Sequence, residues 1–202
     1  GLETLGLLKL DFLGLRNLTV IDNALKLLKE RGENIDIEKI PMDDAKVYKI
    51  FAKGLTIGVF QFESSGMREF LKKLKPTVIE DLIAMNALYR PGPMENIDDF
   101  ISRKHGKKKI EYAHPVMEAI LEETYGIIVY QEQVMQIAHE VAGFTLAEAD
   151  IMRRAVGKKI KKLMDELKVK FIDGALEKHN IPKKRGKEIY ELIEKFAEYG
   201  FN

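Results

Sequence analysis

The sequence contains no cysteine, so disulfide bonds and thiolate zinc sites are excluded. No apolar run approaches the roughly 18 residues that a membrane helix needs, and no charged leader precedes an apolar stretch. We therefore expect neither a membrane span nor a signal peptide, and no membrane among the partners. The cytoplasm is the expected location.

Several signatures of self-contained enzymes are also missing. There is no glycine-rich phosphate loop, no Ser/His/Asp set and no cysteine nucleophile. The four histidines lack the spacing of metal ligands. They are His105, His114, His139 and His179. The chain begins with Gly1 rather than methionine and stops where a helix is ending, so we expect it to be a piece of a longer protein.

Composition indicates a globular protein without a global preference for anions. The chain has 202 residues, of which 46% are hydrophobic, enough for one sizeable core or two small ones. Charged residues make up 32% but nearly cancel to a net charge of +1. Any affinity for a polyanion must therefore come from local basic clusters.

Apolar residues recur mostly at helical spacing, which predicts a mainly α architecture. The expected helices cover residues 18–31, 43–54, 64–75, 78–88, 95–105, 115–123, 131–142, 145–157, 160–179 and 182–199. A short β-leaning segment is expected at 58–62. No repeat or low-complexity linker separates these segments, so we expect one compact array of helices.

Residues 7–15 predict a strand, because apolar and charged side chains alternate along them. Positions 8, 10 and 12 would face a core, while Lys9 and Asp11 would lie about 7 Å apart on the opposite surface. A carboxylate and an ammonium on a stiff element could hold a divalent metal and the phosphates bound to it. The alternative is an exposed charge pair without a function.

A basic run at residues 153–162 carries six positive charges and no acid. On a helix, Arg154 and Lys158 lie one turn apart, with Arg153 on a neighbouring line. Guanidinium and ammonium groups could then meet a phosphate-sized anion together. The alternative is a solvated helix face, with Glu148 and Asp150 neutralising part of the charge.

Two more basic clusters could bind anions. The first combines a helix end with a loop, where long side chains could contact a nucleic-acid backbone without reading its sequence, or could simply keep the loop soluble. Its members are Arg103, Lys104, Lys107, Lys108 and Lys109. The second, residues 183–187, follows Pro182 at a helix start, where the macrodipole disfavours cations and an external anion would relieve them.

Seven segments, taken in order, resemble the bacterial DNA polymerase III alpha subunits, the C-family replicative polymerases. They include Lys-Leu-Asp-Phe-Leu-Gly-Leu-Arg-Asn-Leu-Thr at 9–19, Gly-Val-Phe-Gln-Phe-Glu-Ser at 58–64 with Gly66 and Met67, and Ala-Leu-Tyr-Arg-Pro-Gly-Pro at 87–93. The others lie at 100–106, 124–138, 149–159 and 195–202. The resemblance thus covers nearly the whole chain.

The resemblance implies a role for several of these residues. In this family, three palm aspartates hold two metal ions, here expected to be Mg²⁺, and a helical fingers domain closes over the incoming nucleotide. Asp11 matches the third aspartate and Lys9 the lysine beside it that reaches the triphosphate. Arg153 and Arg154 match the fingers arginines near the nucleotide.

The resemblance also implies how the chain is divided and what it binds. Residues 1–15 would be the last palm strand, and 16–202 the fingers without their C-terminal part. The first two aspartates, the serine loop that contacts phosphate, the thumb and a Lys-Ser-His block are absent, so we expect the isolated chain to be inactive. The intact protein would bind primer-template DNA, deoxynucleoside triphosphates and, through regions absent here, other replicase subunits such as the sliding clamp.

A rival interpretation is a non-enzymatic helical module that binds nucleic acid or serves as a scaffold. Composition and the basic clusters allow it equally well. The strand carrying Lys9 and Asp11 discriminates, because a pure binding module has no need of a metal-binding acid. Two further aspartates upstream in the full reading frame would favour the enzyme.

Overall fold

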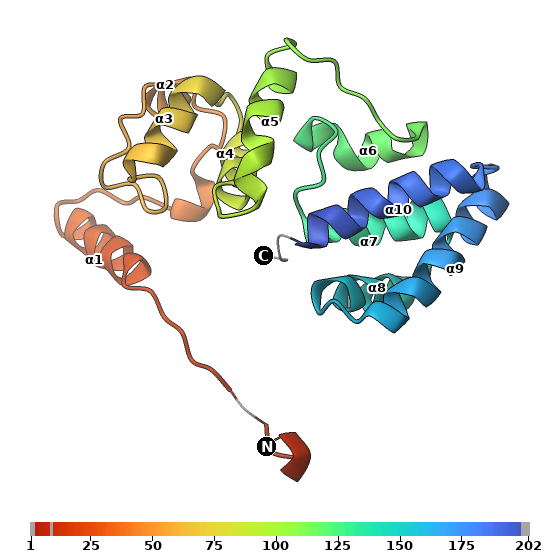
Figure 1. Cartoon of the computed structure of the whole chain (residues 1–202). Helices are drawn as coiled ribbons and strands as arrows, with labels where there is room; N and C mark the ends of the chain where they lie inside the picture. Colours follow the sequence, from red (N-terminus) through yellow and green to blue (C-terminus); the bar gives the residue numbers. More distant parts are fainter. Residues whose placement is uncertain (1–2, 9, 199–202) are drawn as a thin grey trace. The chain divides into compact units, whose positions relative to one another are not determined.

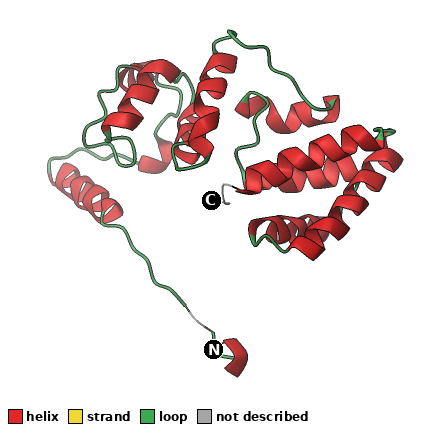
Figure 2. Cartoon of the chain, viewed as in Figure 1, coloured by secondary structure: helices red, strands yellow, loops and turns green. Residues whose placement is uncertain are grey.

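The computed structural model describes residues 3–8 and 10–198 and is mainly helical (Figure 1). The chain divides into two units, Gly1–Met42 and Asp43–Asn202. Within the described residues there are ten α-helices and five short 3-10 helices, and no strand (Figure 2). The prediction of a mainly α architecture is confirmed, whereas the described part of the chain does not contain the expected N-terminal strand.

The first unit contains one α-helix, α1, at Asn17–Glu30, between the 3-10 turns η1 at Glu3–Leu5 and η2 at Ile37–Lys39. The backbone N–H of Arg31 closes α1 on the carbonyl oxygen of Leu28, as the basic last turn predicted. No residue of α1 is buried. The expectation of one compact array is wrong, because the chain divides into two units.

The expected strand at residues 7–15 is wrong for the isolated chain. Its described residues adopt neither helix nor strand. Leu8, Leu10 and Phe12, expected to face a core, are 82%, 65% and 95% exposed. A strand needs a neighbouring strand to pair its backbone N–H and C=O groups, and the described residues offer none.

The first half of the second unit contains α2 at Ala45–Ala52, α3 at Ser65–Leu74, α4 at Ile79–Leu88 and, after the 3-10 turn η3 at Pro93–Asn96, α5 at Ile97–Lys104. They enclose what we call the first core, whose fully buried members include Leu71, Met85 and Phe100. Ser64 begins α3 as predicted, because its Oγ accepts a hydrogen bond from the backbone N–H of Met67 at 3.3 Å.

The β-leaning segment at 58–62 forms turns instead of a strand. The hydroxyl of the fully buried Thr56 donates a hydrogen bond of 2.6 Å to the carbonyl oxygen of Phe62 and so closes the segment into a loop. Gly58 and Gln61 lie in the left-handed region, with φ of 82° and 70°. Two such residues in four turn the chain back and prevent an extended strand.

The second half of this unit encloses what we call the second core, which includes Ile137, Phe144, Phe171 and Tyr190. This half of the unit begins with three short elements, which replace the single helix expected at 115–123. They are η4 at Pro115–Met117, α6 at Glu118–Leu121 and η5 at Glu122–Thr124. Four longer helices follow: α7 at Gln131–Ala142, α8 at Leu146–Gly157, α9 at Lys161–His179 and α10 at Lys183–Glu198. Helix α7 packs on α8 and α9, and α10 packs on α9 (Figure 1).

A glycine lets α9 approach α7 closely. A Cβ atom at Gly174 would lie 2.1 Å from the carbonyl oxygen of Ala142. Glycine in a helix interior normally lowers helix stability, so the close packing of the two helices explains its presence.

Gln133 shapes the segment that leads into α7. Its side chain is buried, accepts hydrogen bonds from the backbone N–H groups of Val129 and Tyr130 at 2.8 and 3.0 Å, and donates to Thr124 Oγ1 at 2.9 Å. These bonds satisfy backbone groups that precede the helix, so the start of α7 is set by its own first turn.

Candidate nucleotide and DNA interface

The two residues proposed for metal and triphosphate binding lie in the first unit. Asp11 is exposed. Lys9 lies outside the described residues. The described residues contain no group of three or more histidine or carboxylate side chains close enough to hold a metal ion. The described chain therefore offers a single acid of the expected metal site.

The two arginines proposed for nucleotide binding project from α8. Thr145 and Glu148 form a capping box that begins this helix at the predicted position, and the ammonium of Lys170 pairs with Glu148. The bonds from Lys170 and from Thr145 hold the pKa of Glu148 at about 2. The negative charge of Glu148 at the start of α8 is thus neutralised by a lysine of the same chain.

Asp150 holds both arginines from one position. Arg153 Nε and Nη2 donate to Asp150 Oδ1 at 2.9 and 2.7 Å, and Arg154 Nε lies 3.1 Å from Oδ2. The Arg153 hydrogen bonds lower the pKa of Asp150, with the Arg154 charge adding to the effect. One carboxylate between two guanidinium groups leaves an excess of one positive charge.

A residue of a second helix, α7, also holds the Arg153 side chain in place. Its Nη1 donates a hydrogen bond of 3.1 Å to Oε1 of Gln131, the first residue of α7. The side chain of Arg153 is 27% exposed and that of Arg154 is 56% exposed. Arg153 is therefore held in one orientation, whereas most of the Arg154 side chain remains open to solvent. The sequence did not predict the role of Gln131, since the contact joins residues 22 positions apart.

The lysines that follow α8 are exposed. Lys158 caps the helix, and its backbone N–H donates to the carbonyl oxygen of Arg154 at 2.9 Å. No ion pair joins any of these lysines to the part of the chain that the structure describes. They are Lys158, Lys159, Lys161 and Lys162. Lys161 and Lys162 lie in the first turn of α9, where the macrodipole adds to their positive charge.

The cluster at residues 103–109 divides into interior and surface members. Lys104 Nζ lies 2.7 Å from Asp81 Oδ2, and the side chains are 8% and 1% exposed. Arg103 Nη1 donates to the carbonyl oxygen of Tyr125 at 3.0 Å, while its buried Nε has no partner among the described residues. Their sequence positions did not distinguish these two cations from their neighbours.

The surface members of this cluster are Lys107, Lys108 and Lys109, all exposed. Lys108 Nζ pairs with Asp99 Oδ2 at 2.6 Å, with both side chains about half exposed. Within the described ranges, Lys107 and Lys109 form no ion pair. These two ammonium groups are thus the members best placed to meet an external phosphate.

The cluster at 183–187 is mostly neutralised within the chain. Lys183 pairs with Asp173 at 2.9 Å, and Arg185 with Glu188 at 2.6 Å. Lys187 lies 3.8 Å from Glu191. These acids come from α9 and α10 themselves, so the cations at the start of α10 have partners without an external anion.

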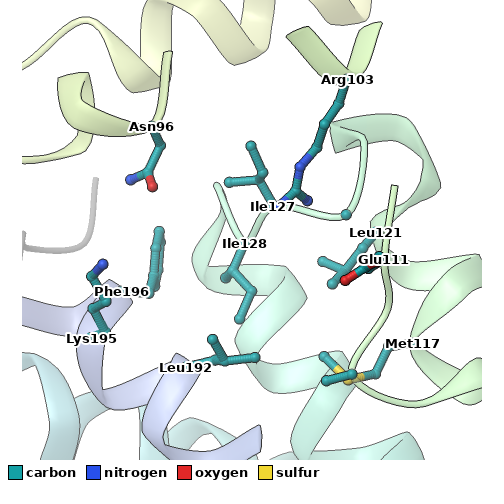
Figure 3. Close-up of a pocket in the computed structure, with 12 residues that line it drawn as sticks. Asn96, Arg103, Glu111, Met117, Leu121, Ile127, Ile128, Leu192, Lys195 and Phe196 are labelled. Atoms are coloured by element: carbon teal, nitrogen blue, oxygen red, sulfur yellow. The ribbon is translucent and has the colours of Figure 1, made fainter. Parts of the chain in front are cut away.

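A hollow of about 180 Å³ lies where α5, α6 and the end of α10 meet (Figure 3). Its apolar wall includes Met117, Leu121, Ile128 and Phe196, and Arg103 reaches into it from α5. A larger hollow of about 490 Å³ lies between the loop before α3 and the end of α4. Its residues were not among the predicted site residues.

No described helix has the length and apolar character needed to cross a membrane.

Residues 17–179 match the family model for the bacterial DNA polymerase III alpha subunit finger domain.

Three curated relatives extend the match to nearly the whole chain. DNA polymerase III subunit alpha of Caulobacter vibrioides is 56% identical over 200 residues, which cover 99% of this chain and 17% of the relative. The protein of the same name from Bacillus subtilis is 54% identical over 202 residues, covering 100% and 18%. That from Aquifex aeolicus is 52% identical over 204 residues, covering 100% and 18%. The chain thus spans less than a fifth of each relative and belongs to the family of the bacterial DNA polymerase III alpha subunit finger domain.

Proposed function

We propose that the chain supplies part of a template-directed replicative DNA polymerase, which joins a deoxynucleoside triphosphate to a primer 3′ end and releases pyrophosphate. The observation that carries this proposal is the family match over residues 17–179. Residues 16–202 are most of the fingers, and residues 1–15 are the last palm strand. The exposed Leu10, Phe12 and Leu13 support that division, because apolar side chains in this number require cover from another part of the protein.

In this proposal, the nucleotide-binding residues of the chain are Lys9, Arg153, Arg154 and Lys158. Asp150 and Gln131 hold the Arg153 guanidinium in one orientation, so less conformational freedom is lost when a phosphate binds. Arg154 and Lys158 stand one turn apart and are exposed, so both can approach the same phosphate group. Their role is positioning and charge neutralisation, which phosphoryl transfer chiefly requires.

Asp11 is the proposed ligand of Mg²⁺ and, with Lys9, the proposed catalytic contribution of this chain. A hard divalent cation takes carboxylate and phosphate oxygens, and two-metal phosphoryl transfer needs several carboxylates. The described residues supply one candidate, so the remaining acids must come from other parts of the intact protein. Residues 7–15 gain their strand conformation there by pairing with those parts.

The geometry of residues 103–109 limits the proposed DNA-contacting surface to three lysines. Lys107, Lys108 and Lys109 remain, because they are exposed and flexible enough to follow a phosphate backbone. Arg103 and Lys104 support this surface from within, since both are bound to partners in the first core. We further propose a cytoplasmic protein whose other replicase partners, such as a sliding clamp, bind outside this chain.

The substitution Asp11→Asn in the intact polymerase tests the catalytic proposal. It removes the negative charge that the metal requires while nearly preserving the size of the side chain. We expect primer extension to fall by several orders of magnitude while the thermal midpoint changes little, because Asp11 is exposed in this chain. Lys9→Ala should have a smaller effect, since it removes one phosphate contact. Near-normal extension by Asp11→Asn would instead support the non-enzymatic binding module.

Salt dependence tests the DNA surface in the 202-residue chain itself. Each phosphate contact contributes about 0.9 to the slope of log affinity against log salt concentration for duplex DNA. The double variant Lys107→Ala/Lys109→Ala should therefore reduce this slope by about two. Lys183→Ala/Lys187→Ala is the charge-matched control, because those ammonium groups already have acidic partners. Equal slopes for the two variants would show that Lys107 and Lys109 do not contact the DNA phosphates.

A further inference from the structure

The smaller hollow, where α5, α6 and the end of α10 meet, has the size of a site for a small molecule (Figure 3). We call it the junction hollow. Its volume of about 180 Å³ exceeds the roughly 150 Å³ of an apolar cavity that takes up a benzene molecule. A ligand that contains one six-membered ring, or an aliphatic body of that size, therefore fits.

Apolar side chains from three segments line one side of the junction hollow. Met117 and Leu121 come from the η4 and α6 region, Ile127 and Ile128 precede α7, and Phe196 lies near the end of α10. Met117 and Leu121 are almost completely buried and belong to the second core. This side of the wall is thus part of the packed interior, and it offers an apolar body a surface that displaces water.

Arg103 is the cation that reaches into the junction hollow, and its donors are only partly used (Figure 3). Its Nη1 donates to the carbonyl oxygen of Tyr125 at 3.0 Å. Its Nη2 lies 4.0 Å from Asp99 Oδ2, too far for a hydrogen bond, because Asp99 bonds to Lys108 instead at 2.6 Å. Nε and Nη2 form one edge of the planar guanidinium, and such an edge can bind the two oxygens of a carboxylate side by side.

The unused donors of Arg103 are exceptional in this chain. Within the described residues, only Arg103 Nε and the Tyr130 hydroxyl are buried side-chain polar atoms without a hydrogen-bond partner. A buried donor without an acceptor costs free energy, so an acceptor that binds beside it is favoured. The Arg103 side chain is only 16% exposed, and the attraction between a guanidinium and a carboxylate is stronger where little water surrounds them.

The other charges around the junction hollow favour a ligand with one negative charge. Lys195 lines it, and its Nζ lies 3.9 Å from Glu95 Oε1 in a pair whose side chains are both exposed. Glu111 also lines the hollow and is exposed. Two cations and one carboxylate on the wall leave an excess of one positive charge. A phosphate with two negative charges therefore suits this wall less well than a monocarboxylate.

We propose that the junction hollow binds a small monocarboxylate with an apolar body of about the size of benzoate. The carboxylate bonds to the free edge of the Arg103 guanidinium, and the apolar body lies against Leu121, Ile128 and Phe196. The bound molecule then connects α5 of the first core with α6 and α10 of the second core. The site is separate from the proposed polymerase function, because its wall contains neither the proposed nucleotide-binding residues nor the three exposed lysines at 107–109.

Ligand-observed fluorine NMR with the 202-residue chain tests this site. The probe is para-fluorobenzoate, which carries one negative charge at neutral pH. Its neutral counterpart is para-fluorobenzyl alcohol, which has nearly the same size, whereas acetate carries the charge without the ring. We expect the benzoate to bind about tenfold more tightly than the alcohol, because it gains one charge-assisted contact with Arg103. Acetate at the same concentration should not displace the benzoate.

The substitution Arg103→Met should bring the ratio of the two affinities close to one. The alcohol should still bind this variant, and its binding would show that the hollow survives the substitution. Arg31→Met makes the same change at an exposed position in the first unit and should keep the original ratio. Glu111→Gln should strengthen binding of the benzoate and leave that of the alcohol unchanged, since a negative charge is lost from the wall.

A second variant tests the position of the site without changing a charge. Leu192 is exposed at the rim of the junction hollow, so the larger side chain of Leu192→Trp can occupy the hollow without entering the second core. Binding of both probes should be lost. Leu146→Trp, at an exposed position of α8, should bind both probes as the wild type does.

Three outcomes would overturn the inference. Equal affinity of the wild-type chain for the two probes, or no binding of either, would show that Arg103 does not select a carboxylate. Binding that survives Leu192→Trp would place the ligand elsewhere on the chain. Binding to the 202-residue chain but not to the intact polymerase would show that another part of the protein covers the hollow. Primer extension is measured separately, so failure of the proposed function would leave these results unchanged.

Discussion

Lys104 and Asp81 form a salt bridge inside the first core, with Nζ 2.7 Å from Oδ2 and side chains only 8% and 1% exposed. The same carboxylate accepts hydrogen bonds from the backbone N–H of Thr77 at 2.8 Å and from the Tyr125 hydroxyl at 3.0 Å. A lysine in a basic cluster thus connects α5, the start of α4 and the segment before α7. Burial, together with the nearby Asp81 charge, also raises the pKa of Tyr125.

We predict that Lys104→Met destabilises the chain strongly, by about 3–5 kcal/mol, because it leaves the buried Asp81 carboxylate without its counter-ion. The measurement is urea unfolding followed by circular dichroism. Lys108→Met is the matched control, since Lys108 forms an equally short pair with Asp99 that is about half exposed. Its cost should be about 1 kcal/mol or less. Similar losses for both variants would show that burial does not distinguish the two pairs.

Gly174→Ala should destabilise the chain, although alanine favours helices. The added Cβ atom would lie 2.1 Å from the carbonyl oxygen of Ala142, so α7 and α9 must move apart, at a cost of about 1–3 kcal/mol. Gly186→Ala is the control, because its nearest contact is an ordinary 3.5 Å to Ile172 Cα. That variant should be neutral or gain up to about 1 kcal/mol. Thermal denaturation of the two variants provides the comparison.

Removal of either arginine proposed to bind nucleotide should weaken nucleotide binding by the intact polymerase. Loss of a charge-assisted contact by Arg153→Ala or Arg154→Ala should cost about 1.5–3 kcal/mol, seen mainly as a raised KM for all four nucleotides alike. The guanidinium groups would contact phosphate, which the four nucleotides share. Steady-state kinetics measure this, with the exposed Arg31→Ala as control. Unchanged kinetics for both variants would identify α8 as a solvated helix face.

His114 should make stability depend on pH near neutrality. Burial, with the charges of His179 and Arg185, lowers the pKa of His114 in the folded chain below its ordinary value. As pH falls through about 6.5, the unfolded state therefore takes up a proton first, and the free energy of unfolding decreases. Stability should be regained as pH rises above that range.

The substitution His114→Asn should flatten this dependence while keeping an acceptor for the backbone N–H of Val116, which now bonds to His114 Nδ1 at 3.3 Å. Urea unfolding of both proteins across this pH range supplies the difference. If the free energy of unfolding of His114→Asn depends on pH as strongly as that of the wild type, another group causes the dependence.

The sequence by itself determined most of the helices, because their hydrogen bonds and caps are local. The helices expected at 64–75, 131–142 and 145–157 agree within a residue or two with α3, α7 and α8, where Ser64 and Thr145 cap the starts of α3 and α8 and Gly143 ends α7. The ordered segments also indicated the family, which the match over residues 17–179 bears out. Neither conclusion needed knowledge of which helices pack together.

Only the tertiary structure decided which polar groups are free. Lys104 and Lys107 lie in one basic cluster, yet Lys104 is bound to Asp81, 23 residues away, whereas Lys107 is exposed. The meeting of residues 58–64 and 87–93 at a hollow likewise depends on how α3 and α4 pack. For the same reason the strand expected at residues 7–15 is absent from the described chain. A strand pairs with distant segments, so its formation depends on neighbours that no local pattern can supply.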